Sequence, residues 1–269
     1  MSAYEAYVGK SETRTDEVSP RLIRGMAATL GVPEPATLPP LWHWMLFQDW
    51  VQPDQIGPDG HPKRGGFLPP VHDLPRRMWA GGRLDFRTPL RPGDAVTRTS
   101  TIKSVTEKQG GSGRLVFVTV RHVVEGPQGV ALEEEQDIVY RGTEGAAVKE
   151  APPRAPEPAA PISREVLPDP VLLFRYSALT GNGHRIHYDM DYVRQVEGYP
   201  GLIVHGPLQA TWLAGLVEDR PIVRFTFRGQ RPAFHGVPLR LEGRPNGQGY
   251  ALRSLDDTGA VCMQAEATV

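Results

Sequence analysis

Alternating apolar and polar positions predict strands in two parts of the chain. Apolar groups take every second position in "RLVFVTVRHVV" (Arg114–Val124) and in "VRFTFRG" (Val223–Gly229). Around these runs we predict strands near residues 83–89, 95–107, 114–125 and 131–142, and again near 222–229, 237–243, 249–255 and 260–268. Because the strands follow one another without intervening helices, we expect antiparallel sheets.

Apolar positions at helical spacing predict a helix ahead of each group of strands. "SPRLIRGMAATLG" (Ser19–Gly31) and "DPVLLFRYSALTG" (Asp169–Gly181) share a plan of cap residue, proline in the first turn, apolar stripe and terminal glycine. Similar segments follow in the same order. "PLWHWML" (Pro40–Leu46) matches "PLQATWL" (Pro207–Leu213), and "PLRPG" (Pro89–Gly93) matches "PAFHG" (Pro232–Gly236). This common order indicates a duplicated unit of helix, second helix and antiparallel sheet.

A Pro/Ala-rich stretch separates the two copies. Residues 143–163, "TEGAAVKEAPPRAPEPAAPIS", have neither strand alternation nor an amphipathic stripe, so we predict an extended linker. The chain then divides into an N-terminal half (1–142) and a C-terminal half (164–269). In the second half, "GPLQATWLAGLVEDR" is apolar around most of its circumference, as a buried helix would be. The predicted class is α+β, with each sheet wrapped around a helix, as in the hot-dog fold.

Composition and charge restrict the partners and the compartment. The 269 residues carry a formal net charge of -1, which gives no electrostatic footprint for nucleic acid or an anionic membrane. A single Cys262 allows no internal disulfide, and no apolar run approaches the roughly 20 residues of a membrane span. The N-terminus lacks the pattern of a signal peptide. We therefore expect a cytoplasmic protein with a small-molecule partner.

The polar chemistry gathers in "TGNGHRIHYD" (Thr180–Asp189), which only the second copy contains. At the equivalent point the first copy continues as Val32-Pro33-Glu34-Pro35. This asymmetry predicts one active site per chain, with the first half degenerate and shaped to hold the rest of a ligand.

This run and two others resemble a known family. "TGNGHRIHYD", the following "GYPGLIVHGPLQATWL" and the earlier "DLPRRMWAGGRLDFRTPLRPGD" are similar to type-2 hydroxyacyl-thioester dehydratases of the MaoC-like hot-dog superfamily. Within it, the double hot-dog mesaconyl-CoA (3-methylfumaryl-CoA) hydratases are most similar. The resemblance implies a double hot-dog fold with two antiparallel sheets, each wrapped around a helix, and a catalytic C-terminal half. It also implies a hydro-lyase that reversibly adds water to an α,β-unsaturated acyl-CoA, most simply a short branched or dicarboxylic one such as mesaconyl-C4-CoA.

Hydration of an enoyl thioester needs a base for water, a proton for the α-carbon and donors for the thioester oxygen. His187 is the candidate base, since its ordinary pKa lies near neutral pH. The superfamily has an aspartate where this chain has Asn182, whose amide can orient water or donate to the thioester but cannot accept a proton. The N–H of Gly206, at the start of a helix, is the candidate oxyanion donor. The named group leads us to expect a bulky Phe at Gly181, so the shape of the acyl pocket is left open.

Further residues are candidates for binding the substrate, which would be an acyl-CoA or an acyl carrier protein. Arginine suits phosphate and carboxylate groups. The candidates are Arg76, Arg77 and Arg83 beside Gly82, together with His184, Arg185 and His205. His184 and His187 are three residues apart, but no third ligand stands at motif spacing, so we predict neither a metal nor another cofactor. The loop Pro53–Pro70 could be a lid or an interaction segment.

Three other functions fit the same residues. Within the same chemistry, the chain could dehydrate (R)-3-hydroxyacyl groups of longer fatty-acyl chains on coenzyme A or acyl carrier protein. It could also be a hot-dog thioesterase, or a non-catalytic acyl-CoA-binding protein in view of the missing aspartate. Two copies of the chain could also pair as a homodimer.

Overall fold

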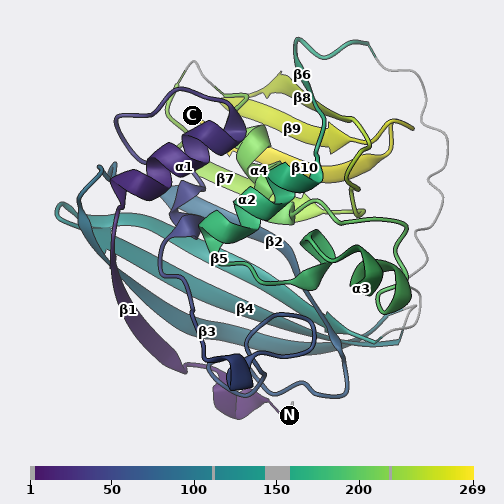
Figure 1. Cartoon of the computed structure of the whole chain (residues 1–269). Coiled ribbons are helices and arrows are strands. Elements are labelled where there is room, and N and C mark those ends of the chain that lie inside the picture. Colours follow the sequence, from purple (N-terminus) through teal and green to yellow (C-terminus); the bar gives the residue numbers. More distant parts are fainter. Residues whose placement is uncertain (1–3, 111–112, 143–157, 218–219) are drawn as a thin grey trace.

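A single antiparallel sheet of ten strands runs through both halves of the chain (Figure 1). The computed structural model describes residues 4–110, 113–142, 158–217 and 220–269. The strands in spatial order are β1 (Ser11–Glu17), β3 (Ala95–Gly110), β4 (Gly113–Gly126), β5 (Gly129–Arg141), β2 (Arg76–Phe86), β7 (Arg224–Gly229), β10 (Val261–Thr268), β9 (Gly249–Leu255), β8 (Leu239–Asn246) and β6 (Ile162–Val166).

The strand order repeats in mirror sense about the centre of the sheet. One half runs β1-β3-β4-β5-β2 and the other runs β6-β8-β9-β10-β7, so β2 and β7 meet in the middle. Their register runs from Gly81 opposite Arg228 to Asp85 opposite Arg224. The two predicted sheets are therefore joined edge to edge into one. The predicted linker falls largely on residues 143–157, which lie outside the described part of the chain, and β6 already begins at Ile162.

Helices cover one face of this sheet, which we call the inner face (Figure 1). The predicted first helices are α1 (Pro20–Leu30) and α2 (Pro170–Thr180), each with proline in its first turn and a left-handed glycine, Gly31 or Gly181, after its last residue. A short helix, α3 (Met190–Gln195), follows the motif. The buried helix α4 (Gly206–Ala214) lies within the C-terminal half, with every side chain from Leu208 to Ala214 buried. In the described residues, no helix is both long enough and apolar enough to cross a membrane.

The expected second helix of the N-terminal half does not form. "PLWHWML" folds instead into a 3-10 turn, η2 (Trp42–Met45), bracketed by left-handed backbone at Leu41 (φ 72°) and Phe47 (φ 58°). These two conformations stop a helix from extending in either direction. A second apolar cluster, separate from the main core, joins residues of the loop before β2 to the inner face of β3, β4 and β5. It contains Phe67, Leu68, Val71, Leu74, Ile102, Val116, Val118, Val120, Ile138 and Tyr140. Of the two halves, only the second wraps its sheet around a helix.

The seam between the halves requires glycine. A side chain at Gly81 would place its Cβ against the backbone oxygen of Phe227 across the β2–β7 pairing. A side chain at Gly82 would lie 2.9 Å from the ring of Phe227. The "AGG" of β2 thus lets the two sheets approach closely enough to pair.

Replacing Gly81 with alanine should lower the free energy of unfolding by roughly 1–3 kcal/mol, because backbone must move to admit the methyl group. Urea denaturation of the purified protein measures the change. Gly142→Ala is the matched control, since nothing lies within 4 Å of a Cβ at Gly142. Equal unfolding midpoints for the two variants would contradict this account of the seam.

Candidate active site

The histidine-containing motif runs from the end of α2 to the start of α3. Gly181 ends α2 in the left-handed region (φ 62°), and η4 (Arg185–His187), a short 3-10 helix, carries His187 inward. Asp189 caps α3, accepting a hydrogen bond from the Tyr192 N–H at 2.9 Å. The chain is thus turned twice within ten residues, which places His187 in the interior while its neighbours stay near the surface.

The hydrogen bonding of His187 fixes its tautomer. Its Nδ1 lies 2.7 Å from the carbonyl oxygen of Ile203. A carbonyl only accepts, so Nδ1 carries the proton and a neutral ring has its lone pair on Nε2. Burial lowers the pKa of His187 to about 4, so the ring is neutral at pH 7. Among the described contacts, none occupies Nε2. This nitrogen is free to act as a base.

His205 supports His187 from behind. The two rings stack with their centroids 3.6 Å apart, and His205 is completely buried. Its Nε2 is 2.8 Å from the Ser177 hydroxyl of α2, and burial keeps its pKa well below the ordinary value. His205 therefore lies between His187 and Ser177 of α2, and its predicted contact with the substrate stays a prediction.

The donor roles of Asn182 and Gly206 stay predictions, and the structure gives the surroundings of both residues. The Asn182 side-chain oxygen accepts a hydrogen bond from the His184 N–H at 3.0 Å, which leaves its NH₂ group as a donor. Gly206 is the first residue of α4, where backbone N–H groups have no partner within the helix. A Cβ at Gly206 would meet only Met263 within 4 Å, at 3.8 Å.

A loop from the N-terminal half is docked onto the motif. The Arg185 N–H donates to the Asp59 carbonyl at 2.9 Å, and the Arg185 guanidinium donates to the Pro58 carbonyl at 3.0 Å and pairs with Asp189 at 2.7 Å. Gly60 and Gly183 touch backbone to backbone, since a Cβ on Gly183 would lie 2.6 Å from the Gly60 oxygen. The guanidinium of Arg185 is thus engaged in holding the loop. Its predicted contact with the substrate stays a prediction. The site is built from both halves.

This loop brings Asp59 and His61 beside His184. His61 Nδ1 is 3.1 Å from the Asp59 carboxylate, and its ring centroid is 4.3 Å from that of His184. Burial lowers the pKa of His61, and burial together with the charge of neighbouring side chains lowers that of His184 to about 2. Burial by itself raises the pKa of Asp59, but its hydrogen bonds to His61 and the charges of His61 and His184 together lower it well below the ordinary value, which keeps the carboxyl ionised.

Asp59 and His61 were not among the predicted site residues, and their loop, Pro53–Pro70, was predicted only as a lid or an interaction segment. A contact across 127 residues leaves no local pattern, and "PDGHP" by itself is ordinary turn sequence. The ligand atoms of Asp59, His61 and His184 lie within 4.8 Å of one another, so this set could hold a divalent cation. The predicted absence of a metal stays a prediction.

The three arginines of β2 have different partners and do not all lie on the same face of the sheet. Arg76 pairs with Glu197 at 3.1 Å. Arg77 stands opposite Tyr140 in β5, and the fully buried Tyr140 lies on the inner face. Arg83 stands opposite Glu135 on the other face, which we call the outer face. Gly82 packs against Phe227 at the seam.

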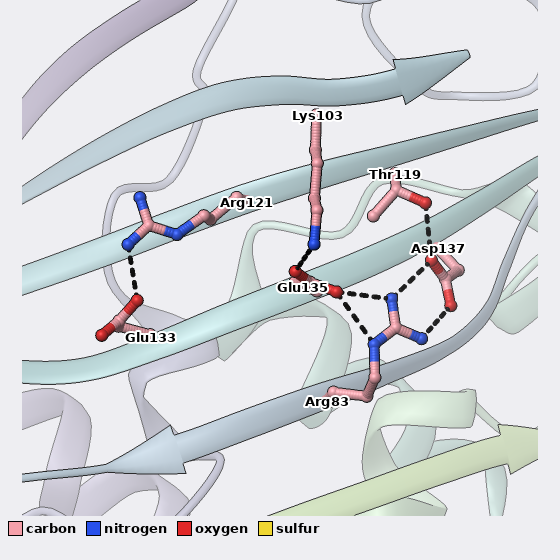
Figure 2. Close-up of polar contacts among 7 residues, drawn as sticks. All are labelled: Arg83, Lys103, Thr119, Arg121, Glu133, Glu135 and Asp137. Carbon is pink, nitrogen blue, oxygen red and sulfur yellow. Dashed lines mark hydrogen bonds and ion pairs between the residues drawn. The ribbon is translucent and has the colours of Figure 1, made fainter.

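Figure 2 shows the outer-face setting of Arg83. Its guanidinium binds Asp137 at 2.7 Å and Glu135 at 3.0 Å, and Lys103 pairs with the same Glu135. Arg83 also lines a groove of about 870 Å³ along this face. The structure does not bring Arg83 to His187.

Gly181, the position at which a phenylalanine was expected, lies against the N-terminal half. A Cβ here would be 3.2 Å from the side chain of Gln48, whose amide donates to the Met45 and Leu179 carbonyls. Gln48 thus fills the space beside Gly181 and completes the end of α2.

Comparisons with known proteins agree with this architecture. The family model described as "Hydroxyacyl-thioester dehydratase type 2" matches residues 41–235. The chain is 45% identical to mesaconyl-C(4)-CoA hydratase of Chloroflexus aurantiacus, covering 97% of this chain and 95% of that protein. It is 26% identical to the mitochondrial hydroxyacyl-thioester dehydratase type 2 of Schizosaccharomyces pombe, covering 76% and 77% of the two chains.

Solved structures share the fold at low identity. A MaoC-like dehydratase from Phytophthora capsici superposes with a TM-score of 0.72 at 16% identity, over 97% of this chain and 95% of that one. A Mycobacterium tuberculosis protein described as a double hotdog fold gives a TM-score of 0.57 at 14% identity, over 97% and 95%. The predicted double hot-dog fold is thereby confirmed, and the chain belongs to the hydroxyacyl-thioester dehydratase type 2 family.

Proposed function

We propose that the protein is a hydro-lyase that reversibly adds water to the double bond of an α,β-unsaturated acyl-CoA, with mesaconyl-C4-CoA as its substrate. The observation that carries the proposal is the neutral His187, whose Nδ1 donates to Ile203 and whose Nε2 is free. The 45% identity to a mesaconyl-C(4)-CoA hydratase over 97% of the chain supports the choice of substrate.

His187 would move one proton in the reaction. Its Nε2 accepts a proton from water as the water oxygen bonds to the β-carbon, and the electron pair of the double bond moves toward the α-carbon and the thioester oxygen. The resulting imidazolium is stabilised through its Nδ1–H by the Ile203 carbonyl, 2.7 Å away. It then returns the proton to the α-carbon, which completes the addition. The reverse sequence removes water.

The other site residues would supply donors and support. The free NH₂ of Asn182 and the N–H of Gly206 are placed to stabilise the water or the thioester oxygen as it gains negative charge. His205 holds the ring of His187, while Arg185 holds the loop that carries Asp59. No step requires a cofactor. We further propose that the protein works in the cytoplasm on coenzyme A esters, with acyl carrier protein esters and pairing of two copies as open alternatives.

Dehydration of 3-hydroxyacyl thioesters with longer chains is the second candidate. It is favoured by the name of the matching family and by the 26% identity to the Schizosaccharomyces pombe enzyme. The same groups would act in the reverse direction. A panel of linear and dicarboxylic enoyl-CoA esters separates the two, since preference for long linear chains would reject mesaconyl-C4-CoA as the substrate.

Replacing His187 with alanine should reduce kcat/KM for hydration by about 100-fold to 10,000-fold, because general base catalysis is lost. Loss of absorbance from the conjugated thioester of mesaconyl-C4-CoA follows the reaction. His72→Ala is the matched control, since the His72 side chain is exposed on the loop before β2. Full activity of His187→Ala would show that another group is the base.

The pH profile of kcat/KM should be flat from about pH 5.5 to 8. The base is active when neutral, so activity is lost only as pH falls through the lowered pKa of about 4. A histidine with an ordinary pKa would instead give a rising limb near pH 6.5. Steady-state rates in constant-ionic-strength buffers, with circular dichroism to verify folding at each pH, distinguish the two. A limb centred near 6.5 would contradict a buried, neutral His187.

A further inference from the structure

Arg77 differs from the other two arginines of β2 in having no carboxylate partner within the described residues. Arg76 pairs with Glu197, and Arg83 pairs with Asp137 on the outer face. Arg64, in the covering loop, donates to backbone carbonyls, including that of Leu74 at 2.7 Å. Among the three arginines of β2, Arg77 is therefore the one whose charge is available to a ligand.

The register of β2 places Arg77 on the inner face. A bulge at Ala80 shifts the alternation, so Arg77 opposite Tyr140 and Trp79 opposite Ile138 share the face of Leu84 opposite Glu134. Residues directly opposite one another in an antiparallel pair have their Cβ atoms about 5 Å apart on the same side of the sheet.

Tyr140 is the buried residue of β5 that lies beside Arg77. Its side chain is completely buried, and no hydrogen bond of ordinary geometry reaches its hydroxyl within the described residues. Burial raises the pKa of Tyr140, whereas the charges of Arg77 and Arg64 and a side-chain hydrogen-bonding interaction with Arg77 act in the opposite direction. The guanidinium of Arg77 therefore lies near the Tyr140 hydroxyl, on the inner face.

His61 and His184 lie within the electrostatic reach of Arg77. Burial is the main cause of their lowered pKa values, and the positive charge of Arg77 lowers both further. His184 in turn lies beside His187, with ring centroids 5.7 Å apart. The guanidinium of Arg77 and the imidazoles of His61 and His184 therefore gather near the candidate base, with the Asp59 carboxylate bonded to His61 at 3.1 Å.

This environment suits a carboxylate better than an alkyl chain. Guanidinium and imidazole N–H groups would lose their hydration beside an alkyl group without gaining a partner, whereas a carboxylate accepts bonds from them. In mesaconyl-C4-CoA the free carboxylate is attached to the β-carbon, the atom that water attacks. A substrate positioned for His187 must therefore hold that carboxylate close to the base.

We propose that Arg77, with His61 and His184 beside it, binds the free carboxylate of a dicarboxylic acyl-CoA and so selects this class of substrate over linear fatty-acyl esters. The proposal rests on the proposed function, because it takes the acyl group of an acyl-CoA to lie beside His187. It assigns to one arginine of β2 the recognition of the acyl end.

Binding of saturated analogues tests this site without turnover. Succinyl-CoA and butyryl-CoA have four-carbon acyl groups that end in a carboxylate and a methyl group, and neither has a double bond to hydrate. Isothermal titration should show that the unmodified protein binds succinyl-CoA at least about tenfold more tightly, as expected for a charge-assisted hydrogen-bonded pair. Arg77→Met should weaken succinyl-CoA binding by at least the same factor and leave butyryl-CoA binding within about twofold. Arg77→Lys should retain part of the preference.

Arg121→Met is the matched control, since Arg121 pairs with Glu133 on the outer face (Figure 2) and should keep the full preference for succinyl-CoA. Thermal unfolding verifies that each variant is folded. If Arg77→Met does not fold, Arg77→Lys is the variant that tests the site. Equal binding of the two esters, or an unchanged preference in a folded Arg77 variant, would overturn the carboxylate site alone. Failure of both esters to bind would contradict the proposed function as well as this site.

Discussion

The hydrogen bond from His187 Nδ1 to the Ile203 carbonyl is the interaction on which the site depends. It sets the tautomer, directs the other nitrogen away from the backbone and offers a stabilising partner if the ring becomes charged. The carbonyl is itself fixed, because the Ile203 N–H donates to Ile186 at 2.9 Å and the Val204 N–H donates to Ala233 at 2.8 Å. Stacking on His205 then fixes the plane of the ring. The candidate base is thus positioned by backbone that leads directly into α4.

The duplicated halves share a strand order but contribute different parts of the candidate site. The C-terminal half keeps a buried helix within its sheet and carries the motif. The N-terminal half has the short turn η2 in place of that helix, and the loop around Asp59 reaches across to the motif. Its strand β2 presents Arg77 on the inner face and closes the seam through Gly81. The candidate site therefore takes its candidate base, His187, from one half and much of its polar surroundings from the other.

Features with a local cause were predictable from the sequence. Proline and glycine at opposite ends defined α1 and α2, and regular alternation defined β4 and β7. The polar edge strand β1, "SETRTDE", was missed because its residues show no apolar alternation. Strand β6 (Ile162–Val166) was missed because it spans the end of the predicted linker at residue 163. "PLWHWML" has a helical composition, but left-handed backbone at Leu41 and Phe47 limits it to a turn.

Features that depend on long-range register could not be read in this way. The bulge at Ala80 decides that Arg77 faces inward while Arg83 faces outward, and nothing in "PRRMWAGGR" separates them. Asp59 and His61 reach the site only through docking of the two halves. The central claim, a neutral His187 with its proton on Nδ1, is tested most directly by ¹⁵N NMR of histidine-labelled protein, with His187→Gln used to assign the signals. We predict a protonated Nδ1 and an unprotonated Nε2 from pH 5.5 to 8. A proton on Nε2, or an imidazolium at pH 7, would contradict the account.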